Sequence, residues 1–460
     1  MATAVEQRSA TDELLSYMDT PDPFRNAPDN LAELQLEAVR ERFADMVKRV
    51  PVLARRAKEV GITEIDTLDD LVPLLFAHTN YKSYPEAFID NGQWKHMNMW
   101  LQTMSSVSTA NIDVEGCMDV DDWIDRAKAA GHFVFSSSGT SGKNSFLNEG
   151  AEERERAKNA YLHGFNIATP NHKPARDRHV FSVMAPKGVH KLTHACNYLY
   201  ESWAKPDGGL HRLIEAPMLA MDTMRPHQLR RLLGAGKIGP SEVEAHEKEL
   251  AEKSKANALR FDNWIEEIVA HRHEPIYIAC MWAQAWMIVE RLRERGIKDG
   301  DFHPDTILSL GGGTKGAKIP ADYREQITAF FGVDESRLSN SYGMVEISGF
   351  NALIQPHGVY ASPPWLVPLV LDKSGERLLN PKDGKGTVEG RMAFFDLNAE
   401  YRWGGIISGD KVTVEFGSDL DGVKTPIIKS IARYTDLEEG EGKLTCAGTI
   451  DAYVRGSVAA

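Results

Sequence analysis

Residues 136–143 read Ser-Ser-Ser-Gly-Thr-Ser-Gly-Lys, and this segment decides which fold to expect. Its hydroxyl side chains and two glycines expose backbone N–H groups, and its lysine adds a positive charge, so the segment suits an anion. An apolar, partly β-branched run at residues 132–135 precedes it and predicts a buried strand. Residues 149–165 follow it with the pattern of a helix. A strand, a loop of small residues and a helix in this order indicate an α/β fold.

The spacing within this loop excludes the phosphate-binding loop of P-loop kinases and ATPases. That loop needs four residues between its glycines and a Ser or Thr after its lysine. Here two residues separate Gly139 from Gly142, and Asn144 follows Lys143. A Ser- and Gly-rich loop taken alone is as often a flexible connector. The interpretation therefore depends on the segments downstream.

Three downstream segments carry further ligand-binding signals. Residues 311–315 read Gly-Gly-Gly-Thr-Lys and follow a predicted strand at 306–310, at the end where α/β folds bind ligands. Residues 340–346 read Asn-Ser-Tyr-Gly-Met-Val-Glu and combine a ring that can stack on a purine with a carboxylate that can hold Mg²⁺. Residues 408–410 read Ser-Gly-Asp and predict a turn whose aspartate suits ribose hydroxyls. Taken singly, each segment also fits a plain turn or a packing residue.

In this order the four segments resemble those of the adenylate-forming superfamily, which contains acyl-CoA synthetases, luciferases and peptide-synthetase adenylation domains. The phosphate loop of that superfamily, (S/T)SG(S/T)TGK, matches residues 137–143 except at Ser141. Its adenine-binding glycines match 311–314, and its ribose-binding Gly-Asp matches 409–410. Its Tyr-Gly-x-Thr-Glu segment is matched at Tyr342, Gly343 and Glu346. The branch that looks most similar, from residues 307–318, 342–349 and 363–365, is that of the acyl-protein synthetases and phenylacetate-CoA ligases.

The resemblance implies both a fold and a reaction. The fold is α/β, the large N-terminal domain of an adenylate-forming enzyme, with mixed sheets, packed helices and a β-rich subdomain. The substrate carboxylate attacks the α-phosphate of ATP and gives an acyl-adenylate and pyrophosphate, and the acyl group then passes to a thiol or amine. ATP and Mg²⁺ are the implied cofactors, and a small apolar, aryl or fatty acid is the implied substrate. CoA, an acyl carrier protein or an amine is the implied acceptor.

The resemblance also implies roles for individual residues. The catalytic residues are Lys143, Thr140 and Glu346, with Thr140 and Glu346 near the metal. The nucleotide-binding residues are Ser137, Ser138, Gly139, Thr140, Ser141, Gly142, Lys143, Gly311, Gly312, Gly313, Thr314, Asn340, Ser341, Tyr342, Gly343, Met344 and Asp410.

The acid-binding pocket is expected between residues 181–203 and a helix that begins near residue 282. The candidates for its lining are Met184, His190, His194, Trp282 and Gly312. Large apolar residues at helical spacing are more often part of a core. His190 and His194 stand four residues apart, but no third ligand for a metal is in sight.

The sequence departs from the superfamily pattern in three respects. Val345 stands where a threonine contacts the α-phosphate, and Thr449 stands where a Gly-Arg-x-Asp segment has its arginine. The pattern beyond residue 448 also leads us to expect an enzyme without the C-terminal lid, in which Lys143 or Lys315 supplies some of the lid's charge. Cys446 is placed like the acyl-accepting thiol of acyl-protein synthetases, although a buried strand residue is the commoner role. The alternative function is therefore a catalytically reduced module that binds a nucleotide or an acyl carrier.

Patterning along the chain predicts four parts. They are an N-terminal helical region at 1–115, an α/β adenylation core at 116–360, a β-rich subdomain at 361–447 and a truncated hinge at 448–460. Pro51 breaks a first helical run, and residues 52–60 predict a short helix that Gly61 closes. Residues 86–120 predict irregular structure, and residues 239–273 predict a charged helical pair. Further predicted elements are strands at 275–279, 366–371, 386–395 and 411–416 and helices at 282–295 and 322–331.

Composition excludes several classes of protein. The net charge of −13 argues against a nucleic-acid partner, because phosphate backbones need a basic surface. No apolar run approaches the roughly 20 residues that cross a bilayer, and residues 1–12 lack the apolar core of a signal peptide. The four cysteines stand far apart and predict neither a zinc ribbon nor a disulfide framework. We therefore expect a reduced, cytoplasmic enzyme.

Overall fold

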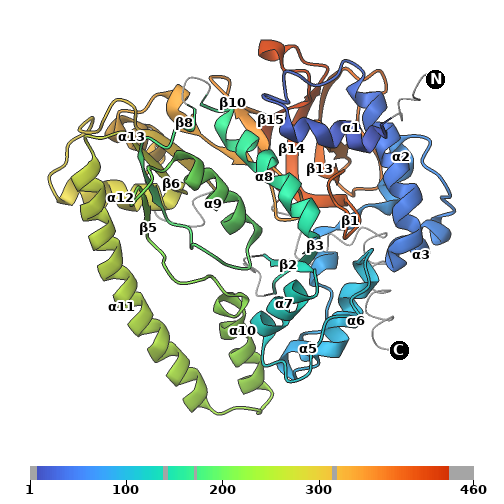
Figure 1. Cartoon of the computed structure of the whole chain (residues 1–460), viewed down its shortest axis with the longest axis horizontal. Helices are drawn as coiled ribbons and strands as arrows, with labels where there is room; N and C mark the ends of the chain where they lie inside the picture. The colour runs from blue at the N-terminus through green and yellow to red at the C-terminus, as the bar shows by residue number, and fades with distance from the viewer. Residues whose placement is uncertain (1–7, 138–142, 170–172, 313–318, 435–460) are drawn as a thin grey trace, which may run out of the picture. The chain divides into compact units, whose positions relative to one another are not determined.

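The computed structural model describes residues 8–137, 143–169, 173–312 and 319–434, in which helices and strands are mixed (Figure 1). The chain divides into two compact units. The first unit comprises residues 1–160, 343–351 and 359–460, and the second comprises residues 161–342 and 352–358. Lys143, Glu346 and Asp410 therefore belong to the first unit, and Gly311 and Tyr342 belong to the second.

Helices form the N-terminal part of the first unit. Pro51 lies in the first turn of one of them and Gly61 ends it in the left-handed conformation, with a φ of 73°, as the sequence predicts. The helices are α1 (Ala10–Ser16), α2 (Leu31–Arg49), α3 (Pro51–Val60), α4 (Leu68–Leu71), α5 (Glu86–Asp90), α6 (Trp94–Met104), α7 (Val120–Ala129) and α8 (Ala151–Asn166), the last of which continues into the second unit.

Residues 86–120 are more regular than the sequence predicts, because α5 and α6 lie within them. Seven of the eleven residues of α6 are buried, among them Trp94, Trp100 and Met104. The buried residues Trp94, Met97 and Leu101 recur at helical spacing, while Lys95, His96 and Met99 are exposed, so α6 has an apolar and a polar face. The prediction of irregular structure is therefore wrong for these two helices.

The β-rich part of the first unit is a largely antiparallel sheet. Its strands follow the order β12 (Leu366–Leu371), β13 (Gly386–Asp396), β14 (Gly405–Phe416), β15 (Ile427–Arg433) and β11 (Val359–Ala361), and β1 (Phe76–Ala77) pairs in parallel with β14. All of β12 and residues 390–396 of β13 are buried, so they form part of the core of this unit. The three strands predicted beyond residue 361 are confirmed, although β14 begins six residues earlier than expected.

The second unit is built on a parallel sheet with the strand order β5, β4, β6, β7, β8. These strands are β4 (His179–Ser182), β5 (Leu210–Arg212), β6 (Ile276–Met281), β7 (Ile307–Gly311) and β8 (Leu338–Ser339). Its helices are α9 (Lys191–Trp203), α10 (Ala220–Gly234), α11 (Pro240–His271), α12 (Trp282–Glu294) and α13 (Tyr323–Phe331). The strands predicted at 275–279 and 306–310 and the helices predicted at 282–295 and 322–331 are confirmed to within two residues. The short strands β9 (Ser341–Tyr342) and β10 (Asn351–Ile354) follow.

Residues 240–271 form one helix of 32 residues, α11, rather than the predicted helical pair. No glycine or proline interrupts the chain between Ser241 and His271, so nothing in the sequence ends the first helix. Near its C-terminus, α11 packs Trp264, Ile265 and Ile268 into a core that it shares with β4, β6, β7, α12 and α13. Despite its length, α11 is too polar to cross a bilayer, and no helix in the described ranges is both long and apolar enough to do so.

Candidate functional site

The phosphate-loop segment connects two antiparallel strands of the first unit, β2 (Phe133–Ser136) and β3 (Phe146–Glu149). The predicted order of strand, loop and helix is therefore wrong locally, because β3 stands between the loop and α8. All four side chains of β3 are buried, so the strand shows no alternation that the sequence could reveal. The loop is thus the connection of a β-hairpin.

The two ends of this loop are closed by hydrogen bonds. The backbone N of Ser137 donates to the O of Ser145 over 3.0 Å, and the backbone N of Ser145 donates to Ser137 Oγ over 2.8 Å. Asn144 Nδ2 also donates to Ser136 Oγ over 2.8 Å. Five expected phosphate ligands, Ser138, Gly139, Thr140, Ser141 and Gly142, lie outside the described residues. The described part of the segment is a closed hairpin base.

Lys143 is held at this base by Tyr84, a residue that no sequence motif marks. Lys143 Nζ donates to the backbone O of Tyr84 and lies 4.5 Å from the centre of its ring, a cation–π contact. The Tyr84 hydroxyl donates to the backbone O of Asn144 over 3.0 Å. The Tyr84 ring is buried, and it packs against Trp100 and Phe146. The position of the ammonium group therefore depends on an aromatic cluster beneath the loop.

Glu346 lies in a buried group of charges in the first unit. Its backbone O accepts a hydrogen bond of 2.9 Å from Arg402 Nη2. The same nitrogen lies 3.7 Å from Asp396 Oδ2 and 3.8 Å from Glu149 Oε1. Burial opposes the charge of Arg402, but the carboxylates around it, Glu153 most strongly, raise the pKa of Arg402 overall. Arg402 therefore stays cationic and fixes the segment that carries Glu346.

The segment after Tyr342 needs its glycines for steric reasons. A Cβ on Gly343 would lie 2.3 Å from Cδ1 of the Phe350 ring. Gly349 has a φ of 95°, and a Cβ there would lie 3.0 Å from Cβ of Ala160. A side chain at either position would push residues 343–349 out of their place, so the glycine of the Tyr-Gly motif has a packing role here.

Residues 408–410 form a bulge rather than the predicted turn. They lie inside β14 opposite one residue of β13, Met392, so the bulged strand carries extra residues at this point. Asp410 Oδ1 lies 3.9 Å from Nε of Arg433, and the Asp410 side chain is 19% exposed. Ser, Gly and Asp favour turns and bulges alike, and only the paired strands distinguish the two. The turn prediction is therefore wrong, but Asp410 stands where a bulge can redirect a side chain.

In the second unit, the carboxyl end of the parallel sheet brings Gly311, Gly312 and Asn340 near one another. Gly311 ends β7 and pairs with Met281, which ends β6. A Cβ on Gly311 would lie 3.7 Å from Asn340 Oδ1, and one on Gly312, whose φ is 66°, would lie 3.5 Å from the Met281 side chain. The Asn340 side chain is in turn fixed by a 2.7 Å hydrogen bond from the backbone N of Ser341. The predicted residues Gly313 and Thr314, and with them Lys315, lie outside the described ranges.

The other residues predicted for the second unit have different surroundings. Tyr342 ends β9 and is half-buried, and Met184 follows β4, with its backbone N donating to Ser182 Oγ over 3.0 Å. His190 is buried immediately before α9, and His194 is half-buried within that helix. Trp282 begins α12, and its ring packs in the core, edge-on to Tyr323 with centroids 5.7 Å apart. Cys446 and Thr449 lie outside the described residues.

Comparison with known proteins finds no matching family model and no matching curated protein. Solved structures of 2-hydroxyisobutyryl-CoA ligase do match. The open conformation in complex with 2-HIB-AMP and CoA has a TM-score of 0.53 at 13% identity, over 88% of this chain and 75% of that chain. The thioesterification state, also with 2-HIB-AMP and CoA, has a TM-score of 0.52 at 13% identity, over 92% and 70%. The resemblance found in the sequence is confirmed at the level of the fold, and the chain has the fold of an adenylate-forming enzyme.

Proposed function

We propose that this chain activates a carboxylic acid with ATP and Mg²⁺, forming an acyl-adenylate and releasing pyrophosphate. One observation carries the proposal, namely that the motifs and the fold point to the same reaction. Four segments that resemble nucleotide-binding motifs occur in the expected order in a chain whose fold matches a ligase solved with 2-HIB-AMP. The motifs are short runs of residues, whereas the fold depends on the whole chain, and their agreement supports an acyl-adenylate as the product.

The proposed reaction leaves little covalent work for the protein. One carboxylate oxygen attacks the α-phosphorus of ATP, the bond from that phosphorus to the α,β-bridging oxygen breaks, and pyrophosphate leaves. Positioning and neutralisation of charge are what such a displacement requires. We assign Lys143 to the phosphates, because its ammonium group is held at the base of the phosphate loop. We assign Asp410 to the ribose and Tyr342 to adenine.

The carboxylate of Glu346 fits a magnesium ion by its chemistry, because Mg²⁺ prefers oxygen ligands. We propose Glu346 and Thr140 as the protein ligands, of which Glu346 lies within the described residues. Bound there, the ion would neutralise charge on the phosphate oxygens. Arg402 has a supporting part in this proposal, because its hydrogen bond to the Glu346 carbonyl holds the segment in place.

The acid and the acceptor form the finer part of the proposal. We propose an apolar, aryl or fatty acid as substrate, bound near Met184, His190, His194, Trp282 and Gly312. We propose a thiol of CoA or of a carrier protein, or an amine, as the acyl acceptor. The ligase with the same fold was solved with CoA, which supports a thiol.

A pyrophosphate–ATP exchange assay tests the first half of the reaction. The purified chain is incubated with ATP, Mg²⁺ and labelled pyrophosphate, together with a panel of fatty, aryl, hydroxy and amino acids. We expect label to enter ATP only when one class of acid is present. Absence of exchange with every acid, in a preparation that binds ATP by calorimetry, would contradict the proposal.

A second candidate function is a nucleotide-binding module without turnover. Val345 favours it, because this residue lacks the hydroxyl that contacts the α-phosphate in the superfamily. Binding of ATP with neither exchange nor AMP formation, whichever acid is supplied, would select this function over the first.

A further inference from the structure

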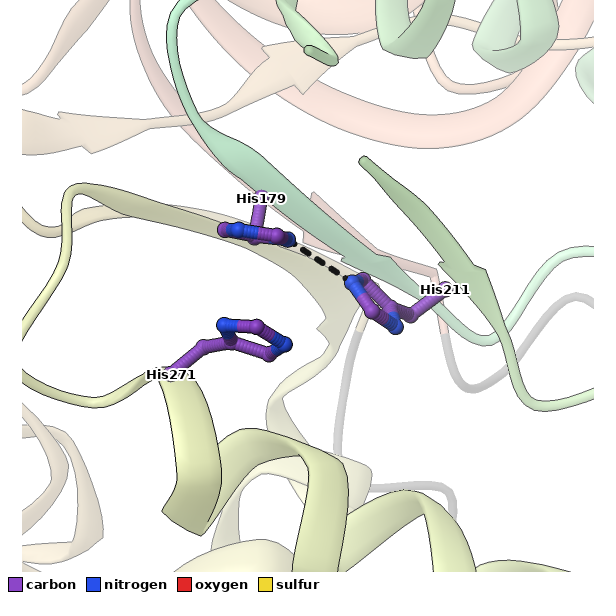
Figure 2. Close-up of side chains that lie close together, drawn as sticks. All are labelled: His179, His211 and His271. Atoms are coloured by element: carbon purple, nitrogen blue, oxygen red, sulfur yellow. Dashed lines mark hydrogen bonds between the residues drawn. The ribbon is translucent and has the colours of Figure 1, made fainter. Parts of the chain in front are cut away.

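Three histidines gather at the edge of the parallel sheet in the second unit (Figure 2). His179 begins β4, His211 lies in the neighbouring strand β5, and His271 ends α11. His211 pairs with Phe181, two residues after His179, so both imidazoles stand on the same face of the sheet. One ring nitrogen from each histidine lies within 4.8 Å of the other two.

Each of the three rings has a carboxylate at one of its nitrogens. Glu267 Oε2 lies 2.9 Å from His211 Nδ1, and Glu274 Oε1 lies 2.8 Å from His271 Nδ1. The second oxygen of Glu274 lies 3.4 Å from His179 Nε2. A carboxylate at one nitrogen fixes the orientation of an imidazole and increases the basicity of the other nitrogen, as it does around metal-bound histidines.

The nitrogens left for an ion are Nδ1 of His179 and Nε2 of His211 and His271. The first two share a hydrogen bond of 2.9 Å, drawn as a dashed line in Figure 2, which an ion bound between them would replace. Tetrahedral zinc with Zn–N bonds of about 2.0–2.1 Å holds two ligand nitrogens roughly 3.3 Å apart, so this pair needs only a small adjustment. His271 stacks on His179 with ring centres 3.7 Å apart and an angle of 21° between the planes. Because an ion must lie in the plane of each ring that binds it, the His271 ring would turn about its χ2 angle on binding.

The three imidazoles are largely buried beside the two carboxylates. The side chains of His179, His211 and His271 are 13%, 14% and 28% exposed. Burial, and then the nearby His271 and Lys205, lower the pKa of His179. Hydrogen bonds from Lys205 and His271 lower the pKa of Glu274 to about 2. The carboxylates of Glu267 and Glu274 place negative charge beside the three rings, which suits a cation.

Aromatic packing also holds the histidine rings close together. The ring of Phe181 stacks on His211 with centres 4.5 Å apart, and Trp264 of α11 stands edge-on to Phe181 at 5.8 Å. Trp264 Nε1 donates to the backbone O of His211 over 3.2 Å. The end of α11 and the strand β5 are thereby held together beside the histidines, which limits how far the rings can separate.

We propose that His179, His211 and His271 bind one divalent transition-metal ion, with zinc as the expected ion. Imidazole ligands suit zinc, copper and nickel. His179 lies at the amino end of β4, whereas Gly311 lies at the carboxyl end of β7, so within the second unit the metal site and the glycine segment are at opposite ends of the parallel sheet. The ion would connect the end of α11 to β4 and β5 and stabilise the second unit. This role is independent of the proposed adenylation.

A zinc titration of the full chain tests this site. After treatment with a chelator and its removal, calorimetry is expected to show one zinc ion per chain. His271→Gln and His211→Gln are expected to lower the affinity at least tenfold. His273→Gln is the matched control, because His273 stands two residues from His271 and its side chain is 63% exposed. We expect it to bind zinc as the wild type does.

Thermal unfolding with and without zinc separates loss of the site from loss of the fold. Zinc is expected to raise the melting temperature of the wild type and of His273→Gln, but not that of His271→Gln. The metal-free variants should still unfold cooperatively, with His271→Gln as the milder change because His271 is the most exposed ligand. A wild type that binds no zinc would overturn the proposal, as would zinc binding that survives His179→Gln, His211→Gln and His271→Gln alike.

Discussion

Among single residues, Lys143 is the cation that we propose for the ATP phosphates, and Tyr84 holds its ammonium group. Lys143→Ala is expected to lower the rate of acid-dependent pyrophosphate exchange on the order of 10²-fold, because a preorganised charge at the reacting phosphates is lost. Initial rates at saturating ATP measure the effect. Lys128→Ala is the control, because Lys128 is an exposed lysine of α7 in the same unit. A Lys143→Ala variant that keeps more than half of the wild-type rate would rule out the assigned role.

The pKa of His78 makes the stability of the chain depend on pH. Burial, and then the charges of Lys82, Arg391 and Arg433, lower the pKa of His78 to about 4. An unfolded histidine titrates near 6.5, so between pH 4 and 6.5 the unfolded chain binds more protons and the free energy of unfolding increases with pH. The contribution of neutral His78 to the free energy of unfolding is complete above pH 6.5 and is lost as the pH falls to about 4. It amounts to something on the order of 3 kcal/mol.

Urea unfolding of His78→Gln at a series of pH values tests this linkage. We expect a shallower dependence on pH between 4 and 6.5 than in the wild type, while His273→Gln, an exposed control, keeps the wild-type slope. Equal slopes for the wild type and His78→Gln would show that His78 is not responsible.

Some residues that hold the candidate site cannot be predicted from the sequence. The motifs selected Lys143 and Glu346, but they could not select Tyr84 and Arg402, which contact them from 59 and 56 residues away. Tyr84 and Arg402 carry no local pattern, because their roles come from contacts that only the folded chain creates.

At the scale of elements, the segment after β9 is fitted tightly against its own unit. Gly343→Ala would bring a Cβ to 2.3 Å from the Phe350 ring, so we expect it to lower the free energy of unfolding by about 1–3 kcal/mol and to displace residues 343–349. Urea unfolding measures the loss. Gly234→Ala, at the end of α10 with no atom within 4 Å of the added Cβ, should be neutral or stabilise by up to about 1 kcal/mol. Equal stability of the two variants would contradict the packing argument.

Arg402 joins several elements of the first unit through one guanidinium group. It lies near Glu149 of β3 and Asp396 of β13, and it donates to the Glu346 carbonyl. Arg402→Met leaves buried carboxylates without their counter-ion and is expected to cost about 3–5 kcal/mol in urea unfolding. Lys411→Ala removes an exposed pair with Glu389 and should cost less than about 1 kcal/mol. A cost for Arg402→Met as small as that of the control would mean that the buried charges are not coupled.

Elements differ in how well local sequence patterns predict them. The strand β12 was predicted with its observed bounds, because an apolar run between turn residues is a clear local signal. Helix α3 was predicted because Pro51 and Gly61 mark its ends. Strand β3 shows no alternation, because all four of its residues are buried, whereas helix α6 does have buried residues at helical spacing that the prediction of irregular structure overlooks. The bulge in β14 was mistaken for a turn, because its partner strand is remote in sequence.

At the scale of the whole molecule, the first unit is assembled from three separate stretches of chain. Local patterns predict strands and helices, but they do not show which stretches share a core. The three histidines of the proposed metal site illustrate the same limit, since they come from β4, β5 and α11 and share no motif. The nucleotide motifs could be found because their chemistry depends on short runs of adjacent residues.

In the proposed reaction a carboxylate oxygen attacks the α-phosphorus of ATP, and an isotope label follows that oxygen. The acid that supports exchange is prepared with ¹⁸O in its carboxylate and incubated with ATP, Mg²⁺, the chain and an acceptor such as CoA or hydroxylamine. We expect AMP that carries one ¹⁸O atom. The bridging oxygen of the acyl-adenylate comes from the acid, and it leaves with the phosphate when the acceptor takes the acyl group. Label in inorganic phosphate together with ADP, or AMP without label, would contradict it.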